Sequence, residues 1–211
     1  MKKLIIFDMD GTLVDSSLTL ARAINHVRKN LGLKAMDDTH ILSKVNEADL
    51  NTAQYFYEAE SFTPQHEQWF ADYYSQHHEQ EIRLYDGIDS FLKELLEKGY
   101  LLALATNAYR VSALESLSYL NILEYFEMVI CHDDVPKGKP YPDMLYAVLK
   151  KLQIKPNEAI FIGDGARDER ASKSANIDYI MVNWGFSYHE NNVENNVVES
   201  IEKLKEKIIN Y

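Results

Sequence analysis

The residues best suited to chemistry in this sequence are four carboxylates that lie just beyond two short apolar runs. Asp8 and Asp10 follow the first run, and Asp164 and Asp168 follow a run near residue 160. Carboxylates gathered in one pocket repel one another unless a hard divalent cation neutralises them, and Mg²⁺ favours oxygen ligands of this kind. If the fold brings the two pairs together, we expect them to form a Mg²⁺ site.

A hydroxyl, an amide and a lysine complete the set. Thr106 and Asn107 follow another apolar run, and Lys139 opens the segment Lys-Pro-Tyr-Pro-Asp at 139–143. With a cation bound, one carboxylate can approach a phosphate dianion, a lysine can balance the developing charge, and a turn at Gly11 can direct backbone N–H groups at the phosphoryl oxygens. These residue types therefore indicate phosphoryl transfer through a phosphoaspartate.

The elements that must position these groups alternate along the chain. Apolar runs typical of strands buried on both faces occur at 4–7, 101–106, 128–131, 159–162 and 179–182. Helix-patterned segments lie between them, near 87–98, 109–120, 142–152 and 167–175. This alternation predicts an α/β fold with a Rossmann-like parallel sheet flanked by helices. Because such sheets bind ligands at the carboxyl ends of their strands, the polar residues that follow the strands should converge.

Residues 16–84 interrupt the alternation. They show helical spacing from Leu20 to Leu31, and Thr63 with Pro64 is typical of the N-cap and first turn of another helix. No convincing strand occurs there. We therefore expect an inserted helical cap domain at 16–84 and an α/β core domain formed by 1–15 and 85–211.

The C-terminal segment predicts a last amphipathic helix. Its apolar stripe carries Val197, Ile201, Leu204 and Ile208, and it follows an Asn-rich loop at 191–196. Intervals of three and four residues are those of one helix face.

Composition narrows the class of protein. The 211 residues are 46% hydrophobic and 26% charged, which is typical of a globular chain of one domain, or of one domain with an insertion. A formal net charge of −11 repels nucleic-acid backbones, so no nucleic-acid partner is expected.

The longest uncharged apolar stretch, at 100–108, is too short to cross a membrane, and the first apolar run is too short for a signal peptide. A single cysteine, Cys131, fits a reducing compartment, so we expect a cytoplasmic protein with no membrane partner.

Taken together, the motifs resemble those of the haloacid dehalogenase superfamily of phosphohydrolases. In order they are Asp8-Met9-Asp10-Gly11-Thr12-Leu13, then Thr106, then Lys139-Pro140-Tyr141-Pro142-Asp143, then Gly163-Asp164 with Asp168. The resemblance spans nearly the whole chain and implies the core fold of that superfamily. The helical insertion after the first motif is similar to the α-helical cap of the phosphoglycolate phosphatase-like and β-phosphoglucomutase-like branch.

The resemblance implies a catalytic role for each matching residue. Asp8 would be the nucleophile that attacks phosphorus, and Asp10 the acid that protonates the leaving oxygen and then activates water. Thr106, Asn107 and Lys139 would bind the phosphoryl group, with Lys139 also pairing with Asp8.

It also implies the ligands of the Mg²⁺ cofactor. These would be the side chains of Asp8 and Asp164 and the backbone carbonyl of Asp10, with Asp168 as a further ligand or as a partner of the ligands. An acid at position 10 favours phosphate esters over halides, because an alkoxide leaving group needs a proton and a halide does not.

The chain departs from the family pattern at two positions. Gly165 stands where a small polar residue is more common, which would loosen the metal shell slightly. Asn176 stands where Gly is usual, and because Asn tolerates the left-handed conformation, this change is expected to be structurally silent.

Several residues of the insertion allow a functional or a structural interpretation. Between 35 and 82 ten acids accompany one base, Lys44, which is either a clamp for a substrate anion or an ordinary surface lysine. The aromatic residues between 55 and 74 predict the core and rim of a helical bundle rather than a base-stacking pocket. His66, His77 and His78 lack the spacing of a metal site.

The main prediction is a Mg²⁺-dependent phosphatase that hydrolyses a small phosphomonoester metabolite, such as phosphoglycolate, a sugar phosphate or a nucleotide. One alternative is a phosphomutase of the β-phosphoglucomutase type, although the cap lysine and arginine spacing of that branch is not found. An alternative from another class is a phospho-acceptor signalling module like a receiver domain, although such modules are much shorter and have no cap. No sequence pattern indicates a partner subunit, so a monomer is the default expectation.

Overall fold

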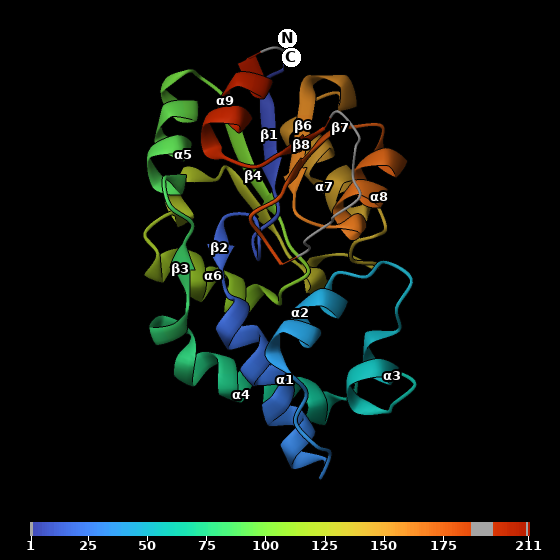
Figure 1. Ribbon diagram of the computed structural model, residues 1–211. Coiled ribbons are helices and arrows are strands. Elements are labelled where there is room, and N and C mark those ends of the chain that lie inside the picture. The colour runs from blue at the N-terminus through green and yellow to red at the C-terminus, as the bar shows by residue number, and fades with distance from the viewer. Residues whose placement is uncertain (1, 187–195, 210) are drawn as a thin grey trace.

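Six parallel strands form the central sheet of the protein (Figure 1). The computed structural model describes residues 2–186, 196–209 and 211. Within these residues the sheet order is β5-β4-β1-β6-β7-β8. The strands are β1 (Leu4–Phe7), β4 (Leu101–Ala105), β5 (Met128–Ile130), β6 (Ala159–Gly163), β7 (Asp178–Val182) and β8 (Val197–Val198). The α/β fold predicted from the sequence is confirmed.

The central strand β1 fixes where the site lies. All four of its residues are apolar and fully buried, and it pairs in parallel with β4 on one side and β6 on the other. Phe7 lies opposite Leu104 and Ile162, so the three strands end at nearly the same height. The residues that follow β1, β4 and β6 therefore share one edge of the sheet, as the sequence predicts.

Helices cover both faces of the sheet. One face carries α5 (Ile88–Glu97), α6 (Arg110–Tyr119) and α9 (Ile201–Ile209), and the other carries α7 (Asp143–Leu152) and α8 (Ala166–Ala175). Successive side chains of a strand point to opposite faces, so Ile5 and Phe7 join the first core cluster while Leu4 and Ile6 join the second. Short 3₁₀ helices occur at Leu123–Tyr125, His132–Asp134 and Pro156–Glu158.

A helical segment, residues 17–81, lies below the carboxyl edge of the sheet in Figure 1, and we call it the cap. Its helices are α1 (Ser17–Asn30), α2 (Asp38–Val45), α3 (Thr52–Tyr57) and α4 (Pro64–Glu81). The two connections to the core pair as an antiparallel ribbon, β2 (Val14–Asp15) with β3 (Arg83–Leu84). The cap has an apolar cluster of its own that includes Ile24, Ile41 and Phe56. The division into domains at 1–15 with 85–211 and at 16–84 stays a prediction.

The C-terminal segment differs from the sequence prediction. Val197 belongs to β8, where it pairs with Met181 of β7, and helix α9 begins only at Ile201. A β-branched residue beside an open sheet edge gains backbone hydrogen bonds and lateral packing there, which outweigh its helical spacing. The predicted Asn-rich loop lies outside the described residues, apart from Asn196.

Local predictions elsewhere agree with the structure. Thr63 caps α4 by accepting a hydrogen bond from the backbone N–H of His66, and Pro64 opens the helix. Asn176 ends α8 in the left-handed conformation, with φ of 54°. Among the described residues, no helix is long and apolar enough to cross a membrane.

Candidate active site

The loop after β1 brings Asp8 and Asp10 to the carboxyl edge of the sheet. The backbone N–H of Asp8 donates to the carbonyl of Ile162 at 2.8 Å, which extends the pairing with β6 past the end of the strand. The loop then turns at Gly11, whose φ of +83° lies in the left-handed region. A Cβ atom there would lie 2.3 Å from Oδ2 of Asp164, so glycine alone permits this close approach.

A buried lysine joins two of the predicted carboxylates. The ammonium of Lys139 donates to Oδ1 of Asp8 and lies 2.7 Å from Oδ1 of Asp168. Burial raises the pKa of Asp8 to about 7, the Lys139 charge opposes this shift, and the Asp168 charge adds to it. Burial alone would lower the pKa of Lys139, but the charges of the two carboxylates raise it overall, so the ammonium stays protonated.

Asp164 completes a cluster of three acids. Ligand oxygens of Asp8, Asp164 and Asp168 lie within 4.8 Å of one another, and all three residues are buried. Burial raises the pKa of Asp164 well above its usual value, and the charges of Asp168 and Asp8 raise it further. Three carboxylates around one ammonium leave an excess of negative charge, and their oxygen atoms suit a hard divalent cation such as Mg²⁺. The residues therefore fit the metal that the sequence predicts.

Two groups from distant parts of the chain hold the Asp164 carboxylate. The backbone N–H of Phe186 donates to Oδ2 at 2.9 Å. The side-chain amide of Asn46, at the end of α2 in the cap, lies 3.1 Å from Oδ1 and 3.3 Å from Oδ2. A Cβ atom on Gly165 would lie 3.1 Å from that of Asn46. The absence of a side chain at Gly165 thus leaves room for Asn46 of the cap to reach the aspartate cluster.

Asp10 lies in a different environment from Asp8. The hydroxyl of Ser16 donates to its Oδ1 at 2.5 Å. Burial raises the pKa of Asp10, while the Ser16 hydrogen bond and the Lys139 charge oppose this shift. A carboxyl group that retains its proton more readily than usual is suited to donate that proton to a leaving group.

Thr106 and Asn107 stand at the end of β4. Thr106 is buried, and its Oγ1 accepts a hydrogen bond from the N–H of Ala108 at 3.0 Å, which leaves the hydroxyl proton able to bind an anion. Both ends of the Asn107 amide bond the peptide groups of Lys139, each at 2.9 Å. The side chain of Asn107 therefore positions Lys139, and any direct contact with phosphate would have to come from its main chain.

The structure places all the predicted site residues at one sheet edge. Asp8, Lys139, Asp164 and Asp168 form the buried cluster, and Asp10, Thr106 and Asn107 lie on the loops beside it. Sequence reasoning missed three contributors: Asn46, the N–H of Phe186 and the Ser16 hydroxyl. Gly185, which lies between two aromatic residues after β7, could have indicated the contribution of the Phe186 N–H. No pattern in the sequence around Asn46 indicated its contact with Asp164.

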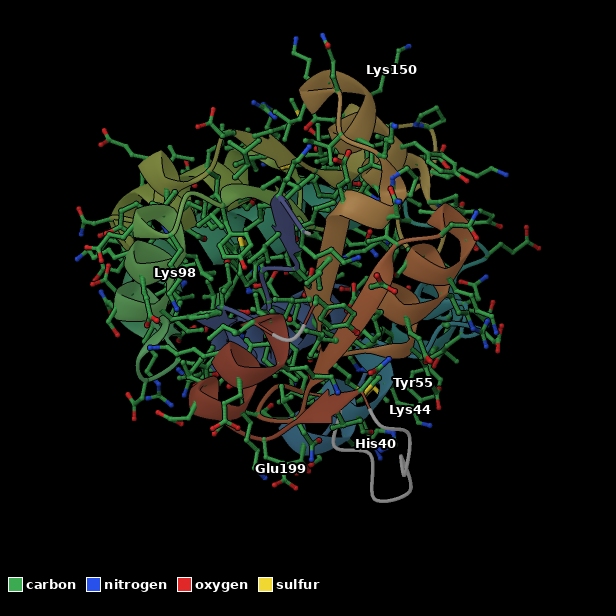
Figure 2. The ribbon with its side chains drawn as sticks, turned by 90° about the horizontal axis from the view of Figure 1, so that it is seen from above. His40, Lys44, Tyr55, Lys98, Lys150 and Glu199 are labelled. Carbon is green, nitrogen blue, oxygen red and sulfur yellow. The ribbon has the colours of Figure 1, made fainter. Side chains whose placement is uncertain are left out.

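The cap residues singled out from the sequence have structural partners. Lys44 pairs with Glu47 at 2.9 Å, and Figure 2 shows it beside His40 and Tyr55 at the edge of the molecule. His66 takes part in the cap of α4, and the ring of His77 stacks on that of Tyr73. Within the described residues, the aspartate cluster is the sole group of three or more acids, histidines or cysteines arranged to hold a metal.

Comparison with known sequences points to one class of enzyme. A family model described as haloacid dehalogenase-like hydrolase matches residues 5–182. A phosphoglycolate phosphatase from Yersinia pseudotuberculosis is 32% identical over 192 residues, which cover 88% of this chain and 83% of that protein. A phosphoglycolate phosphatase from Vibrio vulnificus is 31% identical over 197 residues, which cover 89% and 86% of the two chains.

Solved structures have the same fold along the whole chain. A crystal structure described as a predicted phosphatase from Clostridium acetobutylicum superposes with a TM-score of 0.86 and 25% identity, covering all of both chains. One described as a predicted phosphoglycolate phosphatase from Haemophilus somnus has a TM-score of 0.84 and 25% identity, covering 98% of each chain. Because the superpositions cover nearly the whole chain, the inserted helices at 17–81 have counterparts in these structures as well.

Proposed function

Because the chain belongs to the haloacid dehalogenase-like hydrolase family and is a phosphoric monoester hydrolase, we propose that it hydrolyses a small phosphorylated metabolite through a covalent phosphate on Asp8. One observation carries the proposal. Asp8 directly follows the central strand β1 and is buried against a protonated lysine and two further carboxylates, where with a bound cation it can meet a phosphate dianion.

In the first step, a carboxylate oxygen of Asp8 attacks phosphorus while the bond from phosphorus to the leaving oxygen breaks. Lys139 and the Thr106 hydroxyl hold the phosphoryl oxygens and balance their developing charge. Asp10 gives its proton to the leaving oxygen, so the product departs as a neutral alcohol rather than an alkoxide. Burial raises the pKa of Asp10 above its usual value, which favours retention of that proton.

In the second step, Asp10 is a carboxylate and accepts a proton from a water molecule. The water oxygen attacks phosphorus, the bond from phosphorus to Asp8 breaks, and inorganic phosphate leaves. Asp8 and Asp10 return to their starting protonation states, so each turnover consumes one water molecule.

We propose Mg²⁺ as the cofactor. The carboxylates of Asp8 and Asp164 and the backbone carbonyl of Asp10 would hold it, with Asp168 as a further ligand or as the partner that orients Lys139. When bound, the ion supplies positive charge that lets the anionic nucleophile and the anionic phosphate approach each other.

The test is phosphate release from a panel of phosphorylated metabolites and one aryl phosphate, with and without chelator, beside the Asp8→Asn variant. We expect release that requires Mg²⁺ and is lost in the variant. Absence of release from every compound would contradict the proposal and favour the phosphomutase alternative. A phosphomutase would release no phosphate, but it would convert one sugar phosphate into another, which analysis of the products of the same reactions would reveal.

A further inference from the structure

We propose that Asn46 couples closure of the cap to binding of the cation, because its amide orients the Asp164 carboxylate only while the cap lies on the core. Asn46 is then a positioning residue, which acts on the ion through Asp164 and contacts neither the ion nor the phosphate. This inference rests on the proposed function, in which Asp164 holds the cation.

The Asp164 carboxylate has one anchor in the core and one in the cap. The backbone N–H of Phe186 donates to Oδ2 at 2.9 Å. The side-chain amide of Asn46 lies 3.1 Å from Oδ1, and within the described residues Oδ1 accepts no hydrogen bond from another group. The last torsion of an aspartate side chain is soft, so a single hydrogen bond leaves the plane of the carboxylate free to turn. The cap therefore supplies the second contact that fixes this plane.

A neutral donor suits this place because the carboxylate must remain available to a cation. Asp164 is fully buried beside Asp8 and Asp168, and these two share the ammonium of Lys139. A hydrogen bond stabilises the ionised form of Asp164 against burial and repulsion, and it adds no positive charge that would compete with the ion. Partners that orient metal-binding carboxylates typically contribute about ten- to hundredfold to metal affinity.

The amide reaches the carboxylate because the loop that follows α2 is docked on α8, below the carboxyl edge of the sheet (Figure 1). Nε and Nη2 of Arg167 each lie 3.2 Å from the carbonyl oxygen of Glu47. Arg170, one helical turn further along α8, contacts Asp49 through both of its terminal nitrogens, at 2.5 and 2.6 Å. Movement of the cap away from α8 would therefore withdraw the amide of Asn46 from the aspartate cluster.

Gly165 makes the approach of the amide possible. Its φ of −138° is open to any residue, so the reason for glycine here is space. An added Cβ atom would lie 3.1 Å from Cβ of Asn46 and 3.3 Å from its amide nitrogen. In this chain, an amide from the cap thus occupies the space that a side chain at position 165 would take.

The first test measures the dissociation constant of Mg²⁺ by calorimetry, without substrate, for the full chain and its variants. Asn46→Ala should raise this constant by about tenfold or more. Asn30→Ala makes the same change at an exposed position at the end of α1 and should leave the constant unchanged. Unfolding in urea without Mg²⁺ shows whether each variant is folded. An unchanged Mg²⁺ affinity in folded Asn46→Ala would overturn the inference.

A second variant keeps the amide and displaces it. Gly165→Ala crowds Asn46 without changing its chemistry, so it should weaken Mg²⁺ binding severalfold. Added to Asn46→Ala, it should have less effect than alone, because no amide is left to displace. Full and independent effects of the two substitutions would contradict the inference.

The dependence of activity on Mg²⁺ separates this role from a contact with the substrate. In Asn46→Ala, hydrolysis of an aryl phosphate should fall at limiting Mg²⁺ and recover as the ion concentration rises. Loss of a substrate contact would instead raise KM at every Mg²⁺ concentration, and that result would count against the inference.

Hydrogen exchange tests the reverse effect. If the docked cap favours the ion, the ion must favour the docked cap by the same factor. The N–H groups of Glu47 and Leu50 donate to carbonyls within the docked loop and its helix, and they report on its docking. Mg²⁺ should slow their exchange severalfold in the wild type but not in Asn46→Ala. Equal slowing in both proteins would mean that another contact couples the ion to the cap, and the inference would fail.

Failure of this inference is distinct from failure of the proposed function. If Mg²⁺ binds in a manner that depends on Asn46 but no phosphate ester is hydrolysed, the coupling stands and the phosphatase proposal fails. If hydrolysis requires Mg²⁺ but Asn46→Ala binds the ion as the wild type does, the phosphatase proposal stands and the coupling fails. A wild type that binds no Mg²⁺ would contradict both.

Discussion

The core and the cap handle charge in opposite ways. In the core, Asp8, Lys139 and Asp164 are buried together at strand ends, so their positions are fixed before any ligand binds. In the cap, the pair nearest this cluster, Lys44 with Glu47, is exposed at the surface. Among residues 17–81, the described contact with the aspartate cluster is made by the neutral side-chain amide of Asn46 and not by a charged side chain.

This difference indicates how the work is divided. Buried and preorganised charge stabilises the transition state of any phosphate ester, whatever the leaving group. The cap, which reaches this cluster through Asn46, can select among leaving groups without altering the chemistry. Changes in the core should therefore lower kcat for every substrate, whereas changes in the cap should alter the ranking of substrates.

Replacing the nucleophile should have the largest effect. Asp8→Asn keeps the size of the side chain but removes the attacking oxygen charge, and we expect kcat to fall by more than about 10³-fold for every substrate. Phosphate release under saturating substrate measures this. If Asp8→Asn kept a tenth of the wild-type activity, Asp8 could not be the nucleophile.

Asp10→Asn should separate substrates by their leaving groups. Without the acid, alkyl phosphates should lose about 10²- to 10⁴-fold in kcat, while aryl phosphates, whose leaving groups need less protonation, should lose less. In the wild type the alkyl rate should fall as pH rises through the pKa of Asp10, which burial has raised, because the proton donor is then lost. The variant should lack that limb of the pH profile, and its persistence would contradict the role.

Unfolding in urea should distinguish buried from exposed aromatic residues of the two regions. Phe161 of β6 is fully buried, so Phe161→Ala should lower the free energy of unfolding by about 3–5 kcal/mol. Phe62 in the cap is 47% exposed, and Phe62→Ala should change it by less than about 1 kcal/mol. Equal losses of unfolding free energy in the two variants would contradict this prediction, because Phe62 would then contribute as much to stability as the buried Phe161.

Metal binding should stabilise the core through its carboxylates. Mg²⁺ at about 100 times its dissociation constant should raise the free energy of unfolding by about 2.7 kcal/mol, seen as a higher Tm. Asp164→Asn should abolish that shift, and because it removes one of three repelling charges, its Tm without metal should equal or exceed that of the wild type. A full Mg²⁺ shift in this variant would exclude Asp164 as a ligand.

The smallest effect is expected where the cap meets α8. Asp49→Asn weakens the exposed pair with Arg170 and should raise KM by roughly two- to threefold without changing kcat, because exposed ion pairs contribute little. High salt should produce the same change in the wild type. Glu79→Gln, which removes one acid from the exposed surface of α4, is the matched control. A fall in kcat instead would show that the pair is needed for the chemical steps.

Residues that follow strands were predictable from sequence, because parallel strands deliver their carboxyl ends to one edge. Asp8, Thr106 and Asp164 were found in this way, and Lys139 by its motif. Asn46 was not, since it meets Asp164 across 118 residues through the docking of the cap, which no local pattern encodes. Val197 was misassigned because its helical spacing concealed the sheet edge that it joins.

The most direct test is to look for the phosphate on Asp8. The enzyme is mixed with Mg²⁺ and excess substrate, quenched in acid within one turnover, and its peptides are weighed by mass spectrometry. We expect one added phosphoryl group on the peptide that carries Asp8, at higher occupancy in Asp10→Asn with an aryl phosphate, because water activation is then slow. Turnover without any phosphorylated peptide in either protein, or with the phosphate on another residue, would contradict the account.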